Sequence, residues 1–422
     1  MTAGIIGTRV RALRRDTLVR NSMLLLVSTV VVAAGGFVFW QIAARLFSPA
    51  DVGRTSALIT ASALIANLAL LGMQNSVIRF LHDWEDRAAT VNSAVTVVAL
   101  ASVAGAVVFV AGVDWFAPEL AVLHRPGNAV LFVVFTASLA LTLLNDNVLI
   151  ALQRSGHVAG RNTATVALRL ILPFGCVGLG AFGLFTAYQS AATLALVVYL
   201  VLLHRELGLP TRLRLDTARI ATMWRYSAGN YVATVLLLLP ALVMPNLITH
   251  SLGPERAAYY YIASLIAGVL TFVPQATARS LFAHASADPG RLPGSLRRVV
   301  VLTAAVQIPA LLVIVGAGPF VLRLFGPDYA QAYPLLVVLA VGAALASVSF
   351  VGSTLMLIAG RMRVMCALTG LAALISVGGA YLFGGHGLLW IGAFLLAGEL
   401  VQCVTYTPII ARMVRARAED PR

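Results

Sequence analysis

Long apolar runs dominate this sequence of 422 residues. Each run is about 20 residues long, the length that crosses the hydrocarbon core of a bilayer as a helix. A helix suits that environment because it satisfies its own backbone hydrogen bonds where water is absent. Sixty per cent of the residues are hydrophobic and only 11% are charged, proportions that soluble globular domains do not reach. The sequence therefore predicts an all-α integral membrane protein.

Twelve such runs can be delimited, and the longest polar segment between them separates six runs from six. That segment comprises residues 204–230. We therefore expect two six-helix lobes, residues 1–208 and residues 209–422, with 209–226 as a cytoplasmic linker. The predicted spans are 22–44, 55–81, 91–113, 129–151, 162–183, 184–203, 227–249, 259–283, 299–317, 335–358, 364–384 and 387–411.

The basic side chains indicate how the chain is oriented. All 30 are arginine, and the chain contains no lysine. If the N-terminus is cytoplasmic, 24 arginines fall in the cytoplasmic tails, loops and adjoining helix ends, against five on the other side. Cytoplasmic loops carry such an excess of positive charge, so we expect a multi-pass protein of the cell membrane with both termini cytoplasmic. The same distribution accounts for the net charge of +14 without a nucleic-acid partner.

Two similar turns indicate an internal repeat. The stretch "LFSPADVGRTSAL" follows the first span and "LGPERAAYYYIASL" follows the seventh, with Pro49 aligned to Pro254 and Gly53 to Ala258. Both turns follow the first helix of their half on the same side of the membrane, which predicts a parallel repeat. Within the first turn, Pro49 ends the incoming helix and Asp51 lies where a negative charge suits the dipole of the outgoing helix.

Enzyme signatures are missing from the sequence. The stretch "GLGAFG" at residues 178–183 fits a dinucleotide-binding pattern, but no strand precedes it in its apolar run, so we expect a chance match. The cysteines Cys176, Cys366 and Cys403 lie inside apolar runs and are expected to be packing residues. We therefore expect a protein that is not an enzyme, with no catalytic residues, no metal site and no cofactor.

Polar residues within the spans form stripes at helical spacing. At about 100° per residue, Ser56, Thr60, Asn67 and Gln74 of the second span stay on one face. The eighth span carries Tyr260, Ser264, Thr271 and Gln275 in a similar arc. One interpretation is packing between helices through small and hydroxyl residues. The other is a shared water-filled cavity, which the amides near the helix centres favour.

Asp146 and Arg169 flank the turn "QRSGHVAGRN", each at the same distance in sequence from its midpoint at residue 157.5. In an antiparallel hairpin the two side chains would lie at the same depth, so we expect them to form an ion pair. That pair is either a salt bridge holding spans four and five together or a switchable pair that titrates or meets substrate.

Three further charged residues have two interpretations each. Glu399 lies near the middle of the last span with no charged residue at matching depth in the preceding hairpin. It is either a proton-coupling group or a hydrogen-bonded structural acid. Arg79 and Arg279 end the second and eighth spans on the expected cytoplasmic side. Each either snorkels to the interface or grips an anionic headgroup, since a guanidinium binds phosphate through two parallel hydrogen bonds.

Residues 35–81, "GGFVFWQIAARLFSPADVGRTSALITASALIANLALLGMQNSVIRFL", resemble the opening of polysaccharide or O-antigen (Wzx-type) flippases. These flippases belong to the multidrug/oligosaccharidyl-lipid/polysaccharide exporter superfamily, which includes the MATE transporters. The likeness continues in "LGPERAAYYYIA", "VPQATARSLFAHAS" and "LFGPDYAQAYPLLVVLA", and so covers most of the chain. It implies a MATE-like fold of two six-helix lobes arranged as a V around a cavity that opens alternately to either side of the membrane.

The resemblance also implies a substrate, a polyprenyl-diphosphate-linked oligosaccharide that is turned from the cytoplasmic to the outer face for polysaccharide biosynthesis. Its diphosphate would bind arginines of a cationic cavity, for which Arg45, Arg79 and Arg279 are available. The alternatives are an ion-coupled multidrug or cation antiporter of the same fold, and a non-transporting scaffold of a glycan-assembly complex. Expected partners are the lipid-linked substrate, membrane lipids and other polysaccharide-assembly proteins. Candidate cavity residues are Arg45, Asn67, Gln74, Asn75, Arg79, Thr271, Gln275 and Arg279, and candidates for coupling are Asp146, Arg169 and Glu399.

Overall fold

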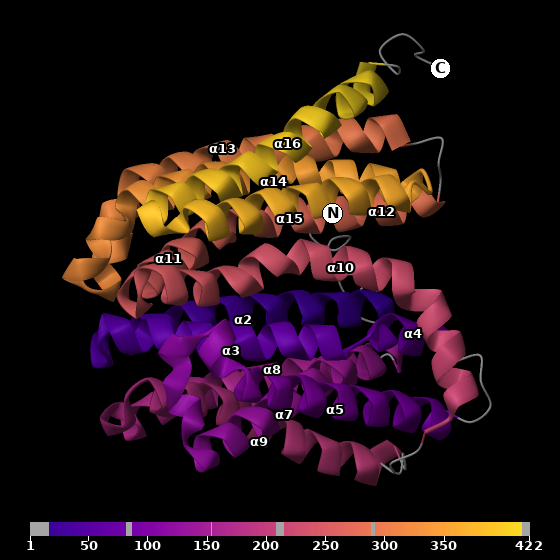
Figure 1. The fold of residues 1–422 in the computed structure, drawn as a ribbon. Coiled ribbons are helices and arrows are strands. Elements are labelled where there is room, and N and C mark those ends of the chain that lie inside the picture. The colour runs from indigo at the N-terminus through magenta and orange to yellow at the C-terminus, as the bar shows by residue number, and fades with distance from the viewer. Residues whose placement is uncertain (1–16, 82–86, 153, 208–214, 288–291, 416–422) are drawn as a thin grey trace, which may run out of the picture. The chain divides into compact units, whose positions relative to one another are not determined.

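A computed structural model describes residues 17–81, 87–152, 154–207, 215–287 and 292–415. Every regular element within these ranges is a helix, as Figure 1 shows. Eleven helical segments in the described part of the chain are long and apolar enough to cross a membrane. The predicted all-α, multi-pass architecture is therefore confirmed.

The predicted span at 162–183 is the one that the structure changes most. Its helix, α8 (Ser155–Ile171), begins earlier and has 17 residues. The apolar run continues into two short 3-10 turns, η2 (Leu172–Gly175) and η3 (Val177–Leu179), rather than into more α-helix. Pro173 lies in η2, where its missing N–H prevents the α-helix from continuing. With α8 added to the eleven longer segments, the structure is consistent with the twelve predicted spans.

The described chain divides into two compact units. Unit 1 comprises Met1–Phe47 and Ser62–Tyr231, and unit 2 comprises Ser48–Ala61 and Val232–Arg422. Two helices, α3 (Pro49–Ala69) and α10 (Thr217–Leu252), contribute residues to both units. The predicted lobe boundary between residues 208 and 209 lies outside the described residues and stays a prediction.

Unit 1 is built on helices that pack side by side, coloured indigo to magenta in Figure 1. Helix α2 packs on α8, α5 packs on α7, and α9 packs on both α7 and α8. Beside parts of α3 and α10, its elements are α2 (Thr17–Leu46), α4 (Met73–Phe80), α5 (Arg87–Ala111), α6 (Val113–Phe116), η1 (Pro118–His124), α7 (Pro126–Ala151), α8, η2, η3 and α9 (Gly180–Leu207).

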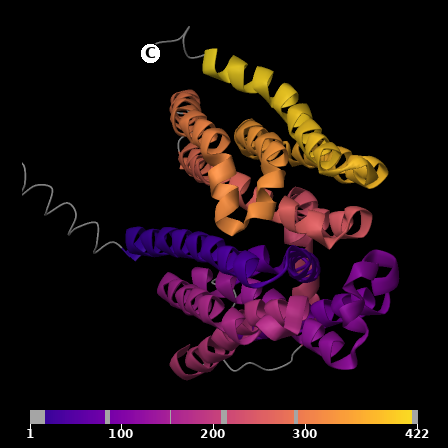
Figure 2. The same ribbon diagram turned by 90° about the vertical axis from the view of Figure 1, so that its left-hand side faces the viewer.

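Unit 2 repeats this arrangement in the second half of the chain, coloured orange to yellow in Figures 1 and 2. Helix α14 packs on α12, α13 and α16, and α15 packs on α16. Its elements are the start of α3, the rest of α10, α11 (Pro254–Gly268), η4 (Val269–Thr271), α12 (Phe272–Ala287), α13 (Leu292–Phe325), η6 (Pro327–Ala332), α14 (Tyr333–Ile358), α15 (Met362–Phe383), η7 (Gly384–His386) and α16 (Leu388–Arg415).

The two units share a pattern of neighbours. In unit 1, α7 contacts α4, α5, α8 and α9, and in unit 2, α14 contacts α12, α13, α15 and α16. These helices occur in the same chain order in the two units. A duplicated segment would produce this correspondence.

The repeated turns bring two backbones close together. Helix α3 begins at Pro49 with a reciprocal cap, in which the Ser48 hydroxyl bonds an Asp51 carboxylate oxygen (2.7 Å) and accepts the Asp51 N–H (3.1 Å). One turn later, a Cβ atom on Gly53 would overlap the carbonyl oxygen of Pro254 at the start of α11 and lie 3.2 Å from the Ala258 nitrogen. Only glycine allows this approach, because the neighbouring atoms are backbone and cannot rotate away.

The second span of each half is interrupted. The predicted continuous helix over 55–81 is wrong, because α3 ends at Ala69 and α4 starts at Met73. Between them Leu71 (φ 47°) and Gly72 (φ 78°) are left-handed, a conformation that ends a helix. In the second half, the 3-10 turn η4 separates α11 from α12. Discontinuous helices at corresponding positions of two repeats are a common feature of transporter binding sites.

Candidate functional site

A cavity of about 790 Å³ lies within unit 2, among α10, α11, α12, α14, α15 and α16. Most of its lining is aliphatic, as is usual for a small-molecule site with a few polar groups that orient the ligand. The polar residues of its lining are Tyr260, Ser264, Thr271, Gln275, Arg279, Thr354, Thr369, Ser376, Glu399 and Gln402.

The eighth span supplies one wall of the cavity. Tyr260 and Ser264 come from α11, Thr271 from η4, and Gln275 and Arg279 from α12. Each polar residue follows the previous one at an interval of four or seven, so the stripe remains on one side through the 3-10 turn. The Gln275 amide donates a 3.2 Å hydrogen bond to the Thr271 hydroxyl. Of the two interpretations given for this stripe, its position in the lining favours the cavity.

Arg279 is the cationic residue of the lining. Its side chain is exposed, and it makes no hydrogen bond or ion pair with any residue that the structure describes. It lies near the end of the span Pro254–Phe282, close to where a membrane surface would be. A guanidinium in that position can accept an anionic group of a ligand without first leaving another partner.

Glu399 of α16 lines the same cavity and lies near the middle of its span, Leu388–Arg412. It accepts a 2.9 Å hydrogen bond from the Ser349 hydroxyl of α14, so it has the hydrogen-bonding partner of a structural acid. The carboxyl group nevertheless borders the cavity, where it can also accept hydrogen bonds from a ligand. Both interpretations given for this acid therefore remain open.

Sequence reasoning missed several polar residues of the lining. Gln402 lies one helical turn beyond Glu399 and is buried, and Thr369 and Ser376 lie seven residues apart on α15. Those intervals of three and seven place residues on one helix face, a signal that was present in the sequence of the eleventh and twelfth spans. Isolated hydroxyls in apolar helices give a weak signal, because they can bond to their own backbone.

The candidates of the N-terminal half lie in unit 1. Arg45 is exposed at the end of α2, and Arg79 of α4 is exposed with its guanidinium carbon 6.0 Å from the Phe80 ring centroid. Asn67 donates a 2.8 Å hydrogen bond to the Ala63 carbonyl oxygen of its own helix. Gln74 and Asn75, at the start of α4, are half-buried. None of them is among the residues described for the cavity of unit 2.

The stripe of the second span does not continue as predicted. The break at residues 70–72 separates Gln74 from the helix that carries Ser56 and Thr60. Ser56 and Thr60 are buried, and Thr60 accepts a 3.1 Å hydrogen bond from the Asn246 amide of α10. For these two residues the structure supports packing between helices rather than a cavity.

The predicted ion pair between Asp146 and Arg169 is wrong. The carboxylate of Asp146 instead binds Arg161, at 2.8 Å and 2.9 Å from one guanidinium nitrogen. Helix α7 ends at Ala151 and α8 begins at Ser155, earlier than the sequence pattern suggested, so Arg161 rather than Arg169 lies at the depth of Asp146. Arg161, one of the 24 arginines that we expected in cytoplasmic tails, loops and adjoining helix ends, is 3% exposed.

Arg169 has a different role in unit 1. Its guanidinium carbon lies 3.5 Å from the ring centroid of Tyr188 on α9, and its Nε donates a 3.2 Å hydrogen bond to the Tyr188 carbonyl oxygen. A cation over an aromatic face is stabilised by the quadrupole of the ring. Arg169 thus links α8 to α9 without an acid.

The other titratable groups offer no obvious metal site. Among the described residues, no three or more histidine, cysteine or acidic side chains gather as metal ligands would. The three cysteines are free thiols, each half-buried. What the cavity provides is an aliphatic lining with amide, hydroxyl, carboxyl and guanidinium groups, which can orient a polar ligand.

Comparison with known proteins extends the sequence resemblance. A profile of the family described as "Polysaccharide biosynthesis protein" matches residues 18–279, more than half of the chain. The comparison with curated protein sequences gives no match.

Three solved structures share the fold. The lipid II flippase MurJ, in an inward closed conformation, matches with a TM-score of 0.74 at 9% identity, over 94% of this chain and 90% of that chain. An inward-facing multidrug resistance MATE family transporter of the MOP superfamily matches with a TM-score of 0.68 at 15% identity, over 97% and 100%. A MOP superfamily transporter from Pyrococcus furiosus matches with a TM-score of 0.64 at 15% identity, over 96% and 98%. At these identities the matches establish the fold, and function has to be argued from the site.

Proposed function

Because the chain belongs to the polysaccharide biosynthesis protein family and has the fold of MOP superfamily transporters, we propose that it is a lipid-linked oligosaccharide flippase. It moves a polyprenyl-diphosphate-linked oligosaccharide from the cytoplasmic to the outer face of the cell membrane, by alternating access, for polysaccharide biosynthesis. A hydrophilic glycan cannot cross hydrocarbon unaided, so the protein has to supply a polar path. The MurJ match supports this proposal, since that relative is described as a lipid II flippase.

The observation that carries the proposal is the composition of the cavity in unit 2. Arg279 lies near one end of its span, and the amides and acid of Gln275, Gln402 and Glu399 continue the polar lining. The guanidinium suits a diphosphate, and the amide, hydroxyl and carboxyl groups suit the hydroxyls of a sugar. The arginine distribution favours a cytoplasmic location for both termini and for Arg279. The prenyl chain remains in the lipid.

The experiment is a flipping assay in proteoliposomes that carry a fluorescent polyprenyl-diphosphate glycan, with and without ion gradients. Arg279→Gln removes the charge, and we expect the flipping rate to fall at least about tenfold, the effect of losing one charge-assisted contact. Arg363→Gln is the matched control, because Arg363 is exposed near the start of α15 and is not part of the described cavity lining. We expect this variant to flip at the wild-type rate.

Two results would contradict the proposal. One is an absence of flipping by the wild-type protein under every gradient, and the other is an equal rate for Arg279→Gln and Arg363→Gln. Arg279→Lys refines the test, because a lysine keeps the charge but loses the two-pronged geometry. An intermediate rate for this variant would support direct contact with phosphate.

The second candidate function is ion-coupled export of multidrug or cationic compounds. Two observations favour it, the match to a MATE family transporter and the carboxyl group of Glu399 in the cavity. An antiporter would move an organic cation against an ion gradient, and Glu399→Gln would abolish that transport by removing the negative charge. Cation transport by the wild-type protein, with no flipping of glycan lipids, would favour this function over the first.

A further inference from the structure

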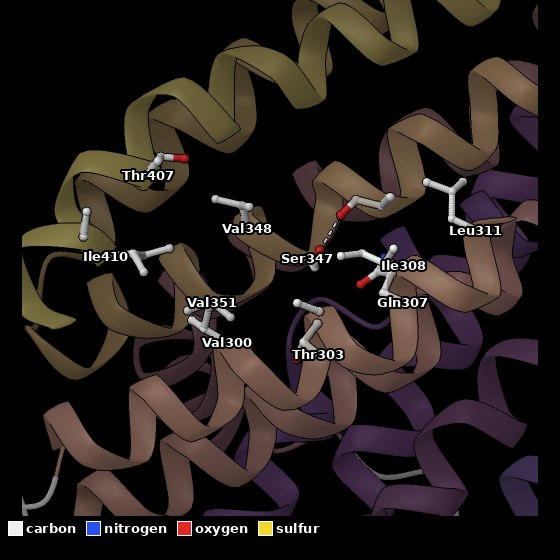
Figure 3. Close-up of a pocket in the computed structure, with 13 residues that line it drawn as sticks. Val300, Thr303, Gln307, Ile308, Leu311, Ser347, Val348, Val351, Thr407 and Ile410 are labelled. Atoms are coloured by element: carbon white, nitrogen blue, oxygen red, sulfur yellow. Dashed lines mark hydrogen bonds between the residues drawn. The ribbon is translucent and has the colours of Figure 1, made fainter.

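A second hollow in unit 2, of about 510 Å³, lies between α13, α14 and α16 and is drawn in Figure 3. Its lining is mostly aliphatic and shares no residue with the lining of the polar cavity. Val300 and Ile308 on its rim are exposed, while Thr303, Gln307 and Val351 at its floor are buried. We call this hollow the α13 groove.

The α13 groove belongs to the part of unit 2 that a bilayer would surround. Of the 18 residues in the most apolar stretch of α13, only 11% are buried, the lowest share among the eleven candidate spans. Gln307 lies near the middle of the span Gly294–Phe325. Molecules that reach the groove therefore come from the hydrocarbon region of the membrane.

One polar atom of the groove floor has no partner. Gln307 is 5% exposed, and its side-chain oxygen is buried with no hydrogen-bond donor in the described part of the protein. Its orientation is fixed, because the amide nitrogen donates a 3.1 Å hydrogen bond to the Ala343 carbonyl oxygen of α14. Turning the amide over would set two oxygens against each other, so the buried oxygen is left without a donor at the groove floor.

The other polar groups of the groove cannot supply the missing donor. The Ser347 hydroxyl donates to the Ala344 carbonyl oxygen, and the Thr407 hydroxyl donates to Cys403 (2.7 Å). The Thr303 hydroxyl lies 3.1 Å from that of Thr277, whose own proton points to carbonyl oxygens of its helix. The hydroxyl donors described for the groove are thus engaged elsewhere, and the Gln307 oxygen is left without a donor in an aliphatic setting.

We propose that the α13 groove binds a neutral lipid alcohol, with its hydroxyl donating a hydrogen bond to the Gln307 side-chain oxygen and its hydrocarbon body lying along the aliphatic walls. A hydrocarbon chain alone would leave the buried acceptor unsatisfied, which is unfavourable. A lipid ammonium would need a negative charge, and the described lining contains none. The hollow is within the size range of ligand sites. This site is independent of the proposed transport function.

The test uses the full-length protein in nanodiscs and a photoreactive farnesol analogue that keeps its hydroxyl. Farnesol and farnesyl methyl ether then compete for labelling, and these competitors differ in the hydroxyl proton. We expect labelling to map to α13, α14 and α16, and the ether to compete about tenfold less well, the effect of about 1.4 kcal/mol. Gln307→Leu removes the acceptor and keeps a side chain of similar size. On this variant we expect farnesol and farnesyl methyl ether to compete equally well for labelling.

Leu312→Ala is the matched control, because Leu312 is exposed on α13 and is not part of the groove lining. This variant should keep the wild-type preference for the alcohol. Equal competition by alcohol and ether on the wild-type protein would overturn the proposal, because it would mean that the groove accepts any hydrocarbon chain. Labelling confined to other helices would also overturn it. The wild-type comparison decides the matter even if Gln307→Leu does not fold.

Discussion

Asp146 of unit 1 and Glu399 of unit 2 are both acids within membrane-spanning helices, and their surroundings differ. Asp146 binds Arg161 at 2.8 Å, and Arg161 also donates to Asn162, whose amide donates to Ser28. Glu399 borders a cavity and accepts a hydrogen bond from Ser349. An intramembrane acid with a buried cation is fixed in place, whereas an acid that borders a cavity remains available to a ligand. The comparison predicts a graded series of substitutions.

Arg161→Gln should have the largest effect on stability. It leaves Asp146 buried without its cation, which costs about 3–5 kcal/mol in unfolding free energy. The measurement is unfolding in mixed detergent micelles. The double variant Asp146→Asn with Arg161→Gln removes both charges and should recover most of the loss. A loss below about 1 kcal/mol for Arg161→Gln would mean that the pair is not structural.

Arg169→Gln should come second, with a loss of about 2 kcal/mol, because it removes the cation from the Tyr188 ring and one hydrogen bond. Comparison with Tyr188→Leu and with the double variant gives the coupling between the two side chains. If the two losses simply add, the stacking in the structure contributes nothing to stability.

Ser349→Ala should lower the unfolding free energy by about 1 kcal/mol, since it removes the hydroxyl that bonds Glu399. Ser347→Ala is a control two residues away on α14, because the Ser347 hydroxyl donates to the Ala344 carbonyl oxygen of the same helix. If Ser349→Ala lowers the unfolding free energy more than Arg169→Gln does, Glu399 is held in place by Ser349 and is not freely available to a ligand.

Glu399→Gln should have the smallest effect on stability, within about 0.5 kcal/mol, because glutamine keeps the size of the side chain and an acceptor for Ser349. Transport is then the sensitive readout. If the carboxylate bonds a sugar, the flipping rate should fall about fivefold, since a charged acceptor forms a stronger hydrogen bond than a neutral one. A wild-type rate with unchanged stability would remove Glu399 from the site.

Much of the fold could be predicted because hydrocarbon restricts what a chain can do. Apolar length identified the spans, and the turn chemistry of Pro49 and Asp51 identified the start of α3. The polar stripe of the eighth span could be predicted because its intervals of four and seven continue through the 3-10 turn.

The failures have local causes. The partner of Asp146 depended on where one hairpin turns, and the "SGHVAG" stretch that looks like a loop begins α8. The stripe of the second span failed because Leu71 adopts a conformation that leucine rarely occupies, which no periodicity reveals. The contact of Thr60 depends on α10, which is far away in the sequence.

The interruption between α3 and α4 holds a strained backbone conformation. Leu71 in the left-handed region is disfavoured by about 1 kcal/mol, which a straight right-handed backbone would release. Its neighbour Gly72 tolerates the bend, and a Cβ there would meet the Ser227 hydroxyl oxygen at 2.5 Å. Leu71→Gly would remove the strain and stabilise the interrupted form of the span, without changing any residue of the described cavity lining.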